Sequence, residues 1–341
     1  METTVLKEGC HVSSMEENIH GKDGNKNIKR PSIPRRRILI ILLVALLILL
    51  IGLSVGLGVG LTRGQATDST SSSSPSTAPT PSTTSVHTTS STTYPNIWSP
   101  TAGTSWQIEI QNPLANTSID VSVYDIDLFA NNASIISTLH GMNRKVICYF
   151  SAGSYEDWRP NASQFNKATD LGKPLDGWPG EWWLQANSAN VRKIMLARMD
   201  MAVSKGCDGV DPDNIDAYDN NNGFSLAQAD AVNYVNFLAD AAHARSLSVG
   251  LKNGGAILGQ VIRNMQWSIN EQCVKYNECD TFRPFIEQGK PVFHIKYLDG
   301  TPDVPAQVVS GTCGNVHAKE FSTVLKRIDL DDWVVEYPSS L

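Results

Sequence analysis

Between residues 105 and 327, short runs of β-branched and apolar residues alternate with stretches whose apolar positions recur at helical spacing. Val232, Val235, Ala239 and Ala242 are one such helical set. The runs predict strands at 105–109, 119–127, 145–151, 208–214, 247–253, 266–272, 291–297 and 321–327. Eight β-α units over about 235 residues match a (β/α)8 TIM barrel, which is the α/β fold class that we predict. An open doubly wound sheet is the alternative, although no G-x-G-x-x-G motif follows an early strand.

A different pattern precedes this region. The stretch from Ile38 to Leu61 contains no charged residue, and it is long enough to cross a bilayer as a helix. Basic residues, including Arg35, Arg36 and Arg37, crowd the N-terminal side of this stretch, whereas only Arg63 closely follows it. The positive-inside rule therefore predicts a cytoplasmic tail at 1–37 and a signal-anchor helix at 38–62, giving a single-pass type II protein of the cell membrane.

The segment at 63–96 consists mostly of Ser, Thr, Pro and Ala. It has too little apolar surface to pack, so we expect a disordered, O-glycosylated stalk that carries an extracellular domain at 97–341. Asn116, Asn132 and Asn161 each begin an N-x-S sequon, which fits an exported glycoprotein.

Charge is divided unevenly along the chain. The tail at 1–37 has eight Lys or Arg and five Asp or Glu, and since the whole chain is −6, the remainder carries −9. An acidic exported domain argues against nucleic acid as a partner and is compatible with a cationic substrate.

Six cysteines are present, and Cys10 is the one on the tail. Five in the exported domain allow at most two disulfides. Cys273 and Cys279, six positions apart, are the first pair that we expect to be joined. A zinc site is the competing interpretation, but no C-x-x-C motif or His cluster supports it.

Polar residues gather where the predicted strands end, the edge that carries the chemistry of a barrel. The stretch GCDGVDPDNIDAY holds four Asp residues, including Asp213, and Glu271 ends the sixth strand. In glycoside hydrolysis one carboxyl protonates the leaving oxygen while another attacks the sugar or activates water. Asp213 and Glu271 therefore predict a glycosidase. Asp125, Asp208 and Asp216 have a second interpretation, as caps or turn formers.

Aromatic residues mark a long segment after the third strand. It holds Trp158, Trp178, Trp182 and Trp183. A loop of this length is usually functional, and Trp faces stack on sugar rings, so we expect two of the four to contact ligand.

Eight segments stand in the order and spacing of one known family: SWQIEIQNPL, DVSVYDIDLF, KVICYFSAGSYEDWRP, GWPGEWW, GCDGVDPDNIDAY, VGLKN, SINEQC and KPVFHIKY. Over residues 97–330 the chain resembles the endo-α-1,4-polygalactosaminidase family of glycoside hydrolases (family 114), and in particular its fungal membrane-anchored members. The resemblance implies a barrel that cleaves α-1,4-linked galactosamine stretches of galactosaminogalactan, a polysaccharide of fungal cell walls and biofilms, without an organic cofactor or a metal.

The resemblance also implies roles for single residues. Asp213 resembles the nucleophile and Glu271 the general acid/base, and we expect retention of configuration. Asp125, Asp127, Asp211 and Glu156 would meet the cationic sugars. The other residues expected to bind substrate are Tyr149, Trp158, Arg159, Glu181, Trp182, Asn214, Tyr218, Lys252, Asn253, Asn270 and Tyr297.

One position departs from the family pattern, because Lys296 stands before Tyr297 where an acidic residue is usual. A lysine in the cleft would repel a galactosamine ammonium or pair with one of the acids. Two alternatives stay open: a hydrolase of another α-linked galactose or N-acetylgalactosamine polymer, and a surface protein that binds polysaccharide without cutting it. We expect a monomer.

Overall fold

The computed structural model describes residues 97–298 and 315–336. The tail, the anchor at 38–62 and the stalk predicted from the sequence lie outside these residues, as does Cys313. No helix within the described residues has the length and apolarity to cross a membrane.

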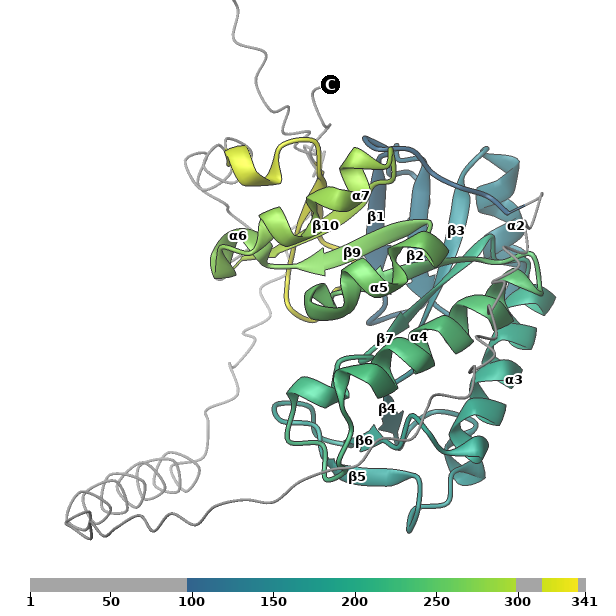
Figure 1. Ribbon diagram of the computed structural model, residues 1–341. Coiled ribbons are helices and arrows are strands. Elements are labelled where there is room, and N and C mark those ends of the chain that lie inside the picture. Colours follow the sequence, from purple (N-terminus) through teal and green to yellow (C-terminus); the bar gives the residue numbers. More distant parts are fainter. Residues whose placement is uncertain (1–96, 299–314, 337–341) are drawn as a thin grey trace, which may run out of the picture. The chain divides into compact units, whose positions relative to one another are not determined.

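A nearly closed, barrel-like sheet forms the body of the domain (Figure 1). Its strands are β1 (Trp106–Glu109), β2 (Val123–Asp127), β3 (Lys145–Ser151), β7 (Gly209–Asp213), β8 (Ser248–Lys252), β9 (Trp267–Glu271), β10 (Val292–Tyr297), β11 (Ser322–Lys326) and β12 (Val334–Glu336). The first eight are parallel neighbours in chain order, and they confirm all eight strands predicted from the sequence. The ninth, β12, pairs antiparallel with β11 and was not predicted.

The two edges of the sheet meet through side-chain and loop contacts. Trp106 Nε1 on β1 donates to Ser322 O on β11 at 2.7 Å. The backbone N of Ile110, just after β1, donates to Leu330 O in the loop before β12 at 3.0 Å. These contacts bring the first and eighth strands together, so all eight carboxyl ends face one region.

Large side chains fill the interior of the barrel. Trp267 on β9 lies across β8, where a Cβ on Gly250 would stand 1.9 Å from its Nε1 atom. Trp106 stacks on Phe293 with 4.8 Å between ring centroids. Neighbouring parallel strands place in-register residues on the same face of the sheet. The side chains in the next layers, nearer the carboxyl ends of the strands, therefore also point into the barrel.

Helices cover the outside of the sheet: α2 (Ala133–Gly141), α3 (Ala189–Lys205), α4 (Gln228–His243), α5 (Leu258–Val261) and α7 (Arg283–Glu287). The short helix α6 (Cys273–Tyr276) follows β9 at its carboxyl end, where Lys275 and Tyr276 line the cleft. The two long helices, α3 and α4, pack on β7 and β8. Ser188 caps α3 by accepting a hydrogen bond from Val191 N, and Gly206 ends it with a left-handed φ of 89°. Short 3-10 helices span 162–164, 217–219, 255–257, 262–264, 279–282 and 316–318.

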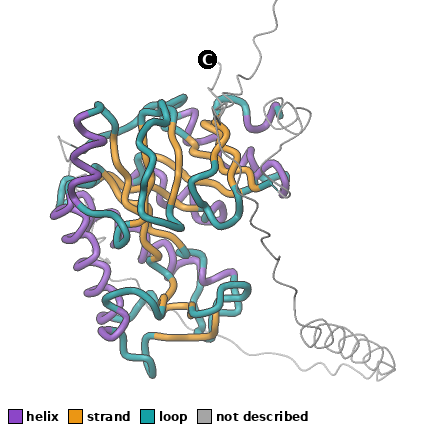
Figure 2. The backbone as a smooth tube through the Cα atoms, turned by 180° about the vertical axis from the view of Figure 1, so that it is seen from behind, coloured by secondary structure: helices purple, strands orange, loops and turns teal. Residues whose placement is uncertain are grey.

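The Trp-rich segment forms a second sheet instead of an irregular loop. It contains β4 (Ser154–Glu156), β5 (Leu171–Pro174) and β6 (Glu181–Leu184), paired antiparallel in the order β4-β6-β5. Figures 1 and 2, which view the molecule from opposite sides, both place this small sheet beyond one end of the barrel. It forms a wall above the carboxyl end of β7.

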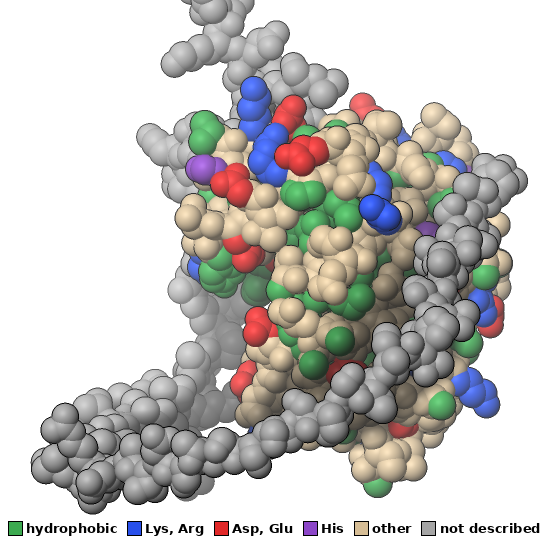
Figure 3. All heavy atoms as spheres, in the orientation of Figure 1, with side chains coloured by type: hydrophobic (Ala, Val, Ile, Leu, Met, Phe, Trp, Pro, Cys, Tyr) green, Lys and Arg blue, Asp and Glu red, His purple; other side chains and the backbone are tan. Residues whose placement is uncertain are grey.

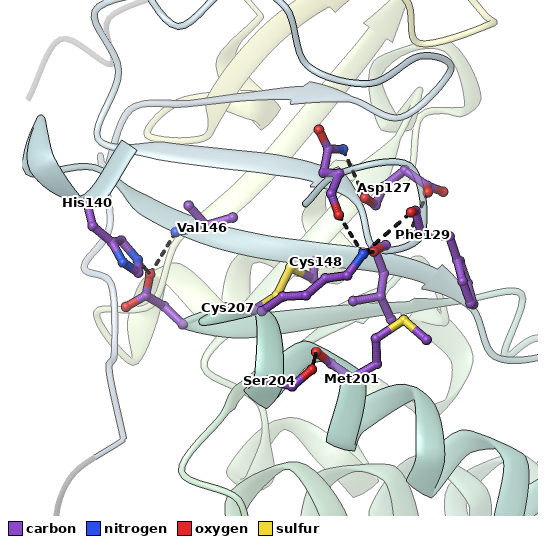
Figure 4. The surroundings of a disulfide bond; sticks show 12 residues. Asp127, Phe129, His140, Val146, Cys148, Met201, Ser204 and Cys207 are labelled. Carbon is purple, nitrogen blue, oxygen red and sulfur yellow. Dashed lines mark hydrogen bonds and ion pairs between the residues drawn. A yellow bond between two sulfur atoms is a disulfide. The ribbon is translucent and has the colours of Figure 1, made fainter. Parts of the chain in front are cut away.

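Two disulfides are formed by the described cysteines. Cys273–Cys279 confirms the pair expected from the sequence. Cys148 on β3 is joined to Cys207, which lies between α3 and β7 (Figure 4). The second bond ties together the two ends of the chain segment that builds the small sheet and α3.

Candidate active site

A cleft of about 1060 Å³ lies at the carboxyl ends of the barrel strands, between their loops and the small sheet. Among the described residues, nine acidic and two basic side chains line it: Asp127, Glu156, Glu181, Asp213, Asp216, Asp219, Glu271, Glu278 and Asp329, with Arg159 and Lys275. Figure 3 shows acidic and apolar side chains close to one another on the visible face of the domain. The balance of charge gives the cleft a negative field that attracts cations.

Asp213, the last residue of β7, projects into the cleft. Its Oδ1 accepts a hydrogen bond from the backbone N of Asn214 at 2.7 Å. The hydroxyl of Tyr149 on β3 donates to Oδ2 at 3.3 Å, and Lys252 Nζ on β8 donates to the same oxygen at 3.4 Å. Donors on both neighbouring strands therefore fix the direction of this carboxylate.

Glu271 ends β9 on another side of the same cleft. Asn253 Nδ2 donates to its Oε2 at 2.8 Å, and the hydroxyl of Tyr297 donates to Oε1. Burial acts to raise the pKa of Glu271, but the charge of Lys252 and the bonds from Tyr297 and Asn253 lower it below its usual value. The protein is thus built to hold Glu271 as an anion before substrate arrives.

Three charged residues predicted to bind substrate lie beneath the floor of the cleft. Asp125 and Asp211 are fully buried, and Lys252 is 2% exposed. Lys252 Nζ lies 3.6 Å from Asp211 Oδ2. Burial raises the pKa of Asp211 to about 7, and burial together with the facing Asp211 raises that of Asp125 well above its usual range. None of the three lines the cleft.

Two buried salt bridges of Arg159 stabilise one wall of the cleft. Arg159 Nη1 lies 2.7 Å from Asp127 Oδ2, and its Nη2 lies 2.7 Å from Glu156 Oε1. The guanidinium also stands 4.7 Å from the centre of the Phe129 ring. Because both carboxylates already neutralise Arg159, this cation opposes a cationic ligand only weakly.

Glu181 and Asp216 are cleft carboxyls whose pKa is raised overall. Burial raises the pKa of Glu181 to about 7, although Ser154 Oγ donates to its Oε2 at 2.6 Å. Burial and the nearby charge of Asp213 raise the pKa of Asp216 to about 6. Both groups therefore change charge near neutral pH.

Exposed apolar side chains stand around the rim of the cleft. Trp158 and Trp178 line it from the small-sheet segment and are 54% and 50% exposed. Tyr276 and Ile328 line it from other loops and are 63% and 62% exposed. Large apolar groups held in water beside a polar cleft are typical of surfaces that stack on sugar rings.

The structure divides the predicted site residues into two groups. Lining the cleft are Asp127, Tyr149, Glu156, Trp158, Arg159, Glu181, Asp213, Asn214, Tyr218, Asn253, Glu271 and Tyr297. Asp125, Asp211, Lys252, Asn270 and Trp182 do not line it. Asn270 faces the other side of β9, where its Oδ1 accepts from Cys273 N at 3.0 Å, and Trp182 packs against Tyr155 with 5.7 Å between ring centroids.

The structure corrects the placement of Lys296. On β10, Phe293 and Ile295 belong to the barrel interior and Tyr297 lines the cleft, so the alternation of a strand turns Lys296 to the opposite face. Lys296 is not among the residues that line the cleft. It therefore stands outside the space in which it was expected to repel an ammonium group.

Several cleft residues were not among the predicted site residues. Asp216 and Asp219 come from the turn after β7, and Gln272, Tyr276 and Glu278 follow β9. A sequence signal existed for Asp216, which belongs to the Asp-rich stretch after Gly206. The residues after β9 lie beyond the strand end, where the path of a loop decides which side chains turn inwards.

The profile of glycoside-hydrolase family GH114 matches residues 87–340, which is most of the chain. The chain belongs to family GH114. It is a glycoside hydrolase, and its acidic cleft lies at the carboxyl ends of the strands, the edge that carries the active sites of barrel enzymes.

Solved structures agree with the family assignment. The GH114 chain is 56% identical to Aspergillus fumigatus Ega3, solved in complex with galactosamine, over 70% of this chain and 97% of Ega3, with a TM-score of 0.68. The glycoside hydrolase domain of PelA from Pseudomonas aeruginosa is 12% identical, over 67% of this chain and 98% of that domain, with a TM-score of 0.53, and shares the fold. An uncharacterized protein of Deinococcus radiodurans is 28% identical over 180 residues, which are 46% of this chain and 57% of that protein.

The raised pKa values in the GH114 cleft predict a pH dependence of substrate binding. Glu181 and Asp216 are mostly neutral below about pH 6 and ionise as pH rises towards about 7, adding negative charge to the cleft. We expect KM for a cationic oligosaccharide to fall between pH 5.5 and pH 7.5, and each of Glu181→Gln and Asp216→Asn to remove about fivefold of that change.

Steady-state kinetics across this pH range would measure the effect. An N-acetylated, uncharged oligosaccharide is the control ligand, since its KM gains nothing from added negative charge. A fall in KM of equal size in Glu181→Gln, Asp216→Asn and the unaltered protein would contradict the assignment.

Proposed function

We propose that this GH114 enzyme cleaves internal α-1,4 bonds in galactosamine-rich stretches of galactosaminogalactan. The observation that carries the proposal is the lining of the cleft, to which the described part of the chain contributes nine acidic and two basic side chains. One of the cations, Arg159, is already neutralised by Asp127 and Glu156. A chain of free amino sugars is the class of polysaccharide whose charge complements such a cleft.

Two further observations support this substrate class. Ega3, 56% identical over 97% of its length, was solved with galactosamine bound. The exposed rings of Trp158 and Trp178 at the rim attract both the apolar faces of sugars and their ammonium groups.

Asp213 and Glu271 are the reacting carboxylates in our proposal. Asp213 attacks the anomeric carbon, and Glu271 gives a proton to the leaving oxygen and later takes one from water, so configuration is retained. Three donors orient Asp213 towards the cleft. The lowered pKa of Glu271 in the free protein means that this residue must gain its proton as the reaction begins, which favours turnover at acidic pH.

The decisive experiment compares polymers of different charge. Purified full-length chain is incubated with deacetylated galactosaminogalactan and with the same polymer after chemical N-acetylation, and products are analysed by mass spectrometry. We expect galactosamine oligomers at a rate at least about tenfold above that on the acetylated polymer. Faster cleavage of the acetylated polymer would point instead to a hydrolase of N-acetylgalactosamine chains, and binding without cleavage would refute the proposed reaction.

We also propose that residues 38–62 anchor the enzyme as a type II membrane protein with its catalytic domain outside the cell, acting as a monomer. Support comes from the uncharged stretch and its basic N-terminal flank. Fractionation of cells with carbonate extraction would test the anchor, and release of the enzyme into the soluble fraction would contradict it.

A further inference from the structure

Lys252 lies inside the barrel, between the cleft and a pair of buried carboxyls. Its Nζ atom is 3.4 Å from Asp213 Oδ2 and 3.6 Å from Asp211 Oδ2, and it stands 5.4 Å from the centre of the Tyr149 ring. The side chain is 1% exposed. A buried ammonium is expensive unless anions surround it, so this position implies a use for the charge.

Ionisable groups face Lys252 from five strands of the barrel: Asp125 on β2, Tyr149 on β3, Asp211 and Asp213 on β7, Glu271 on β9 and Tyr297 on β10. Asp125 and Asp211 are both fully buried and face each other. Two carboxyls so placed cannot both ionise at modest cost, so at least one stays protonated and the pair carries at most one negative charge. That charge partly offsets the charge of Lys252.

Substrate cannot reach this cluster, because Asp125, Asp211 and Lys252 lie under the cleft floor. The link to the cleft is Asp213, whose Oδ2 is the atom that Lys252 contacts. The oxygen has a single other side-chain donor among the described residues, the hydroxyl of Tyr149. Lys252 is therefore the cation that meets this carboxylate from below.

We propose that Lys252 is a positioning residue that holds Asp213 as an anion pointed into the cleft, and that the Asp125–Asp211 pair partly offsets the charge of Lys252 from below. The inference rests on the proposed reaction only for its kinetic consequence, since the contact between Lys252 and Asp213 exists without substrate. It assigns a role to three residues that the sequence placed in contact with sugar.

Lys252→Met tests the proposal, with Lys252→Arg as the matched variant that keeps the charge. In Lys252→Met we expect kcat to fall about 100-fold with KM within about threefold, and the acid limb of the kcat profile to move up by about 1 to 3 pH units. Lys252→Arg should recover a large part of kcat and return the limb to within about half a pH unit of the unaltered enzyme.

The double variant Asp125→Asn/Asp211→Asn is expected to shift the acid limb of the kcat profile in the opposite direction. It removes the buried negative charge while leaving Lys252 in place, so Asp213 ionises more readily and the acid limb moves to lower pH. A role in packing alone would lower kcat in both variants without moving the limbs in opposite directions. If Lys252→Met does not fold, as judged by its thermal unfolding, the double variant still decides the matter.

Failure of this inference can be separated from failure of the proposed reaction. Carboxyl ¹³C NMR follows the titration of Asp213 without substrate, and its midpoint should rise in Lys252→Met and fall in the double variant. A midpoint and an acid limb that stay in place in both variants would overturn the role of Lys252. A wild-type protein that cuts no polymer but shows the two opposite shifts would overturn the reaction alone.

Discussion

Replacing either Asp213 by Asn or Glu271 by Gln is expected to lower kcat/KM for polymer hydrolysis by about 10³-fold or more while the fold is retained. An amide has nearly the shape of the carboxyl, but it can neither attack the anomeric carbon nor transfer the proton. Both side chains end barrel strands and line the same cleft, so each substitution removes chemistry without removing a core contact.

Asp219→Asn is the matched control, because Asp219 also lines the cleft but is exposed and lies beyond the end of β7. It should change kcat/KM by no more than about threefold, because one solvent-exposed charge contributes little to binding. Initial rates of reducing-end formation measure all three variants, and circular dichroism checks that they fold. Retention of a tenth of the activity in either Asp213→Asn or Glu271→Gln would contradict the carboxylate pair.

The two roles can be separated with azide and an activated glycosyl substrate. Small Ala variants leave space for azide to replace the missing carboxylate. In Asp213→Ala azide attacks the sugar directly and gives an azide product of inverted configuration. In Glu271→Ala it attacks the glycosyl-enzyme and gives a product of retained configuration. Exchanged outcomes would reverse the assignment of nucleophile and acid/base.

Removal of the Cys148–Cys207 bond is expected to lower the free energy of unfolding by about 4 kcal/mol, since it joins residues 59 positions apart. The enclosed segment holds the small sheet and α3, including the cleft residues Glu156 and Trp158. In the unfolded chain this long loop gains most freedom when the bond is lost. Figure 4 shows the bond beside the chain reversal between α3 and β7.

The second disulfide, Cys273–Cys279, is the internal comparison. All four cysteines are buried, but this pair is six positions apart, for which the same relation gives about 2 kcal/mol. Urea unfolding of Cys148→Ala/Cys207→Ala and of Cys273→Ala/Cys279→Ala would compare the two. Equal losses, or a larger loss for the short pair, would show that loop length does not govern their contributions.

The eight barrel strands could be predicted because each contains β-branched, aromatic or other apolar residues within a short segment that alternates with helical patterns. The small sheet could not. Its strands, such as Glu181–Leu184, are three or four residues long, and Gly and Pro interrupt the segment around them. Strands this short are stabilised by their partners and by the barrel beneath them, which a local pattern does not contain.

Of the cysteines, only the pair close in sequence was expected. Cys148 and Cys207 are brought together by the parallel pairing of β3 with β7, in which Cys148 stands opposite Val210. The spacing of the two cysteines in the sequence does not predict their disulfide, because the pairing of two distant strands depends on the whole sheet.

What the sequence alone determined is that strand-end residues such as Asp127, Asp213 and Glu271 lie at the barrel mouth, since the last residues of parallel strands must gather at one edge. Depth within the barrel was decided by the tertiary structure. Asp125 and Asp211 each precede a cleft-lining Asp by two positions on the same strand, which is about 6.6 Å along a strand and one layer further inside. That distance separates carboxyls that line the cleft from carboxyls that face each other beneath its floor. Burial depends on how all eight strands stagger around the barrel, so only the closed sheet could assign it.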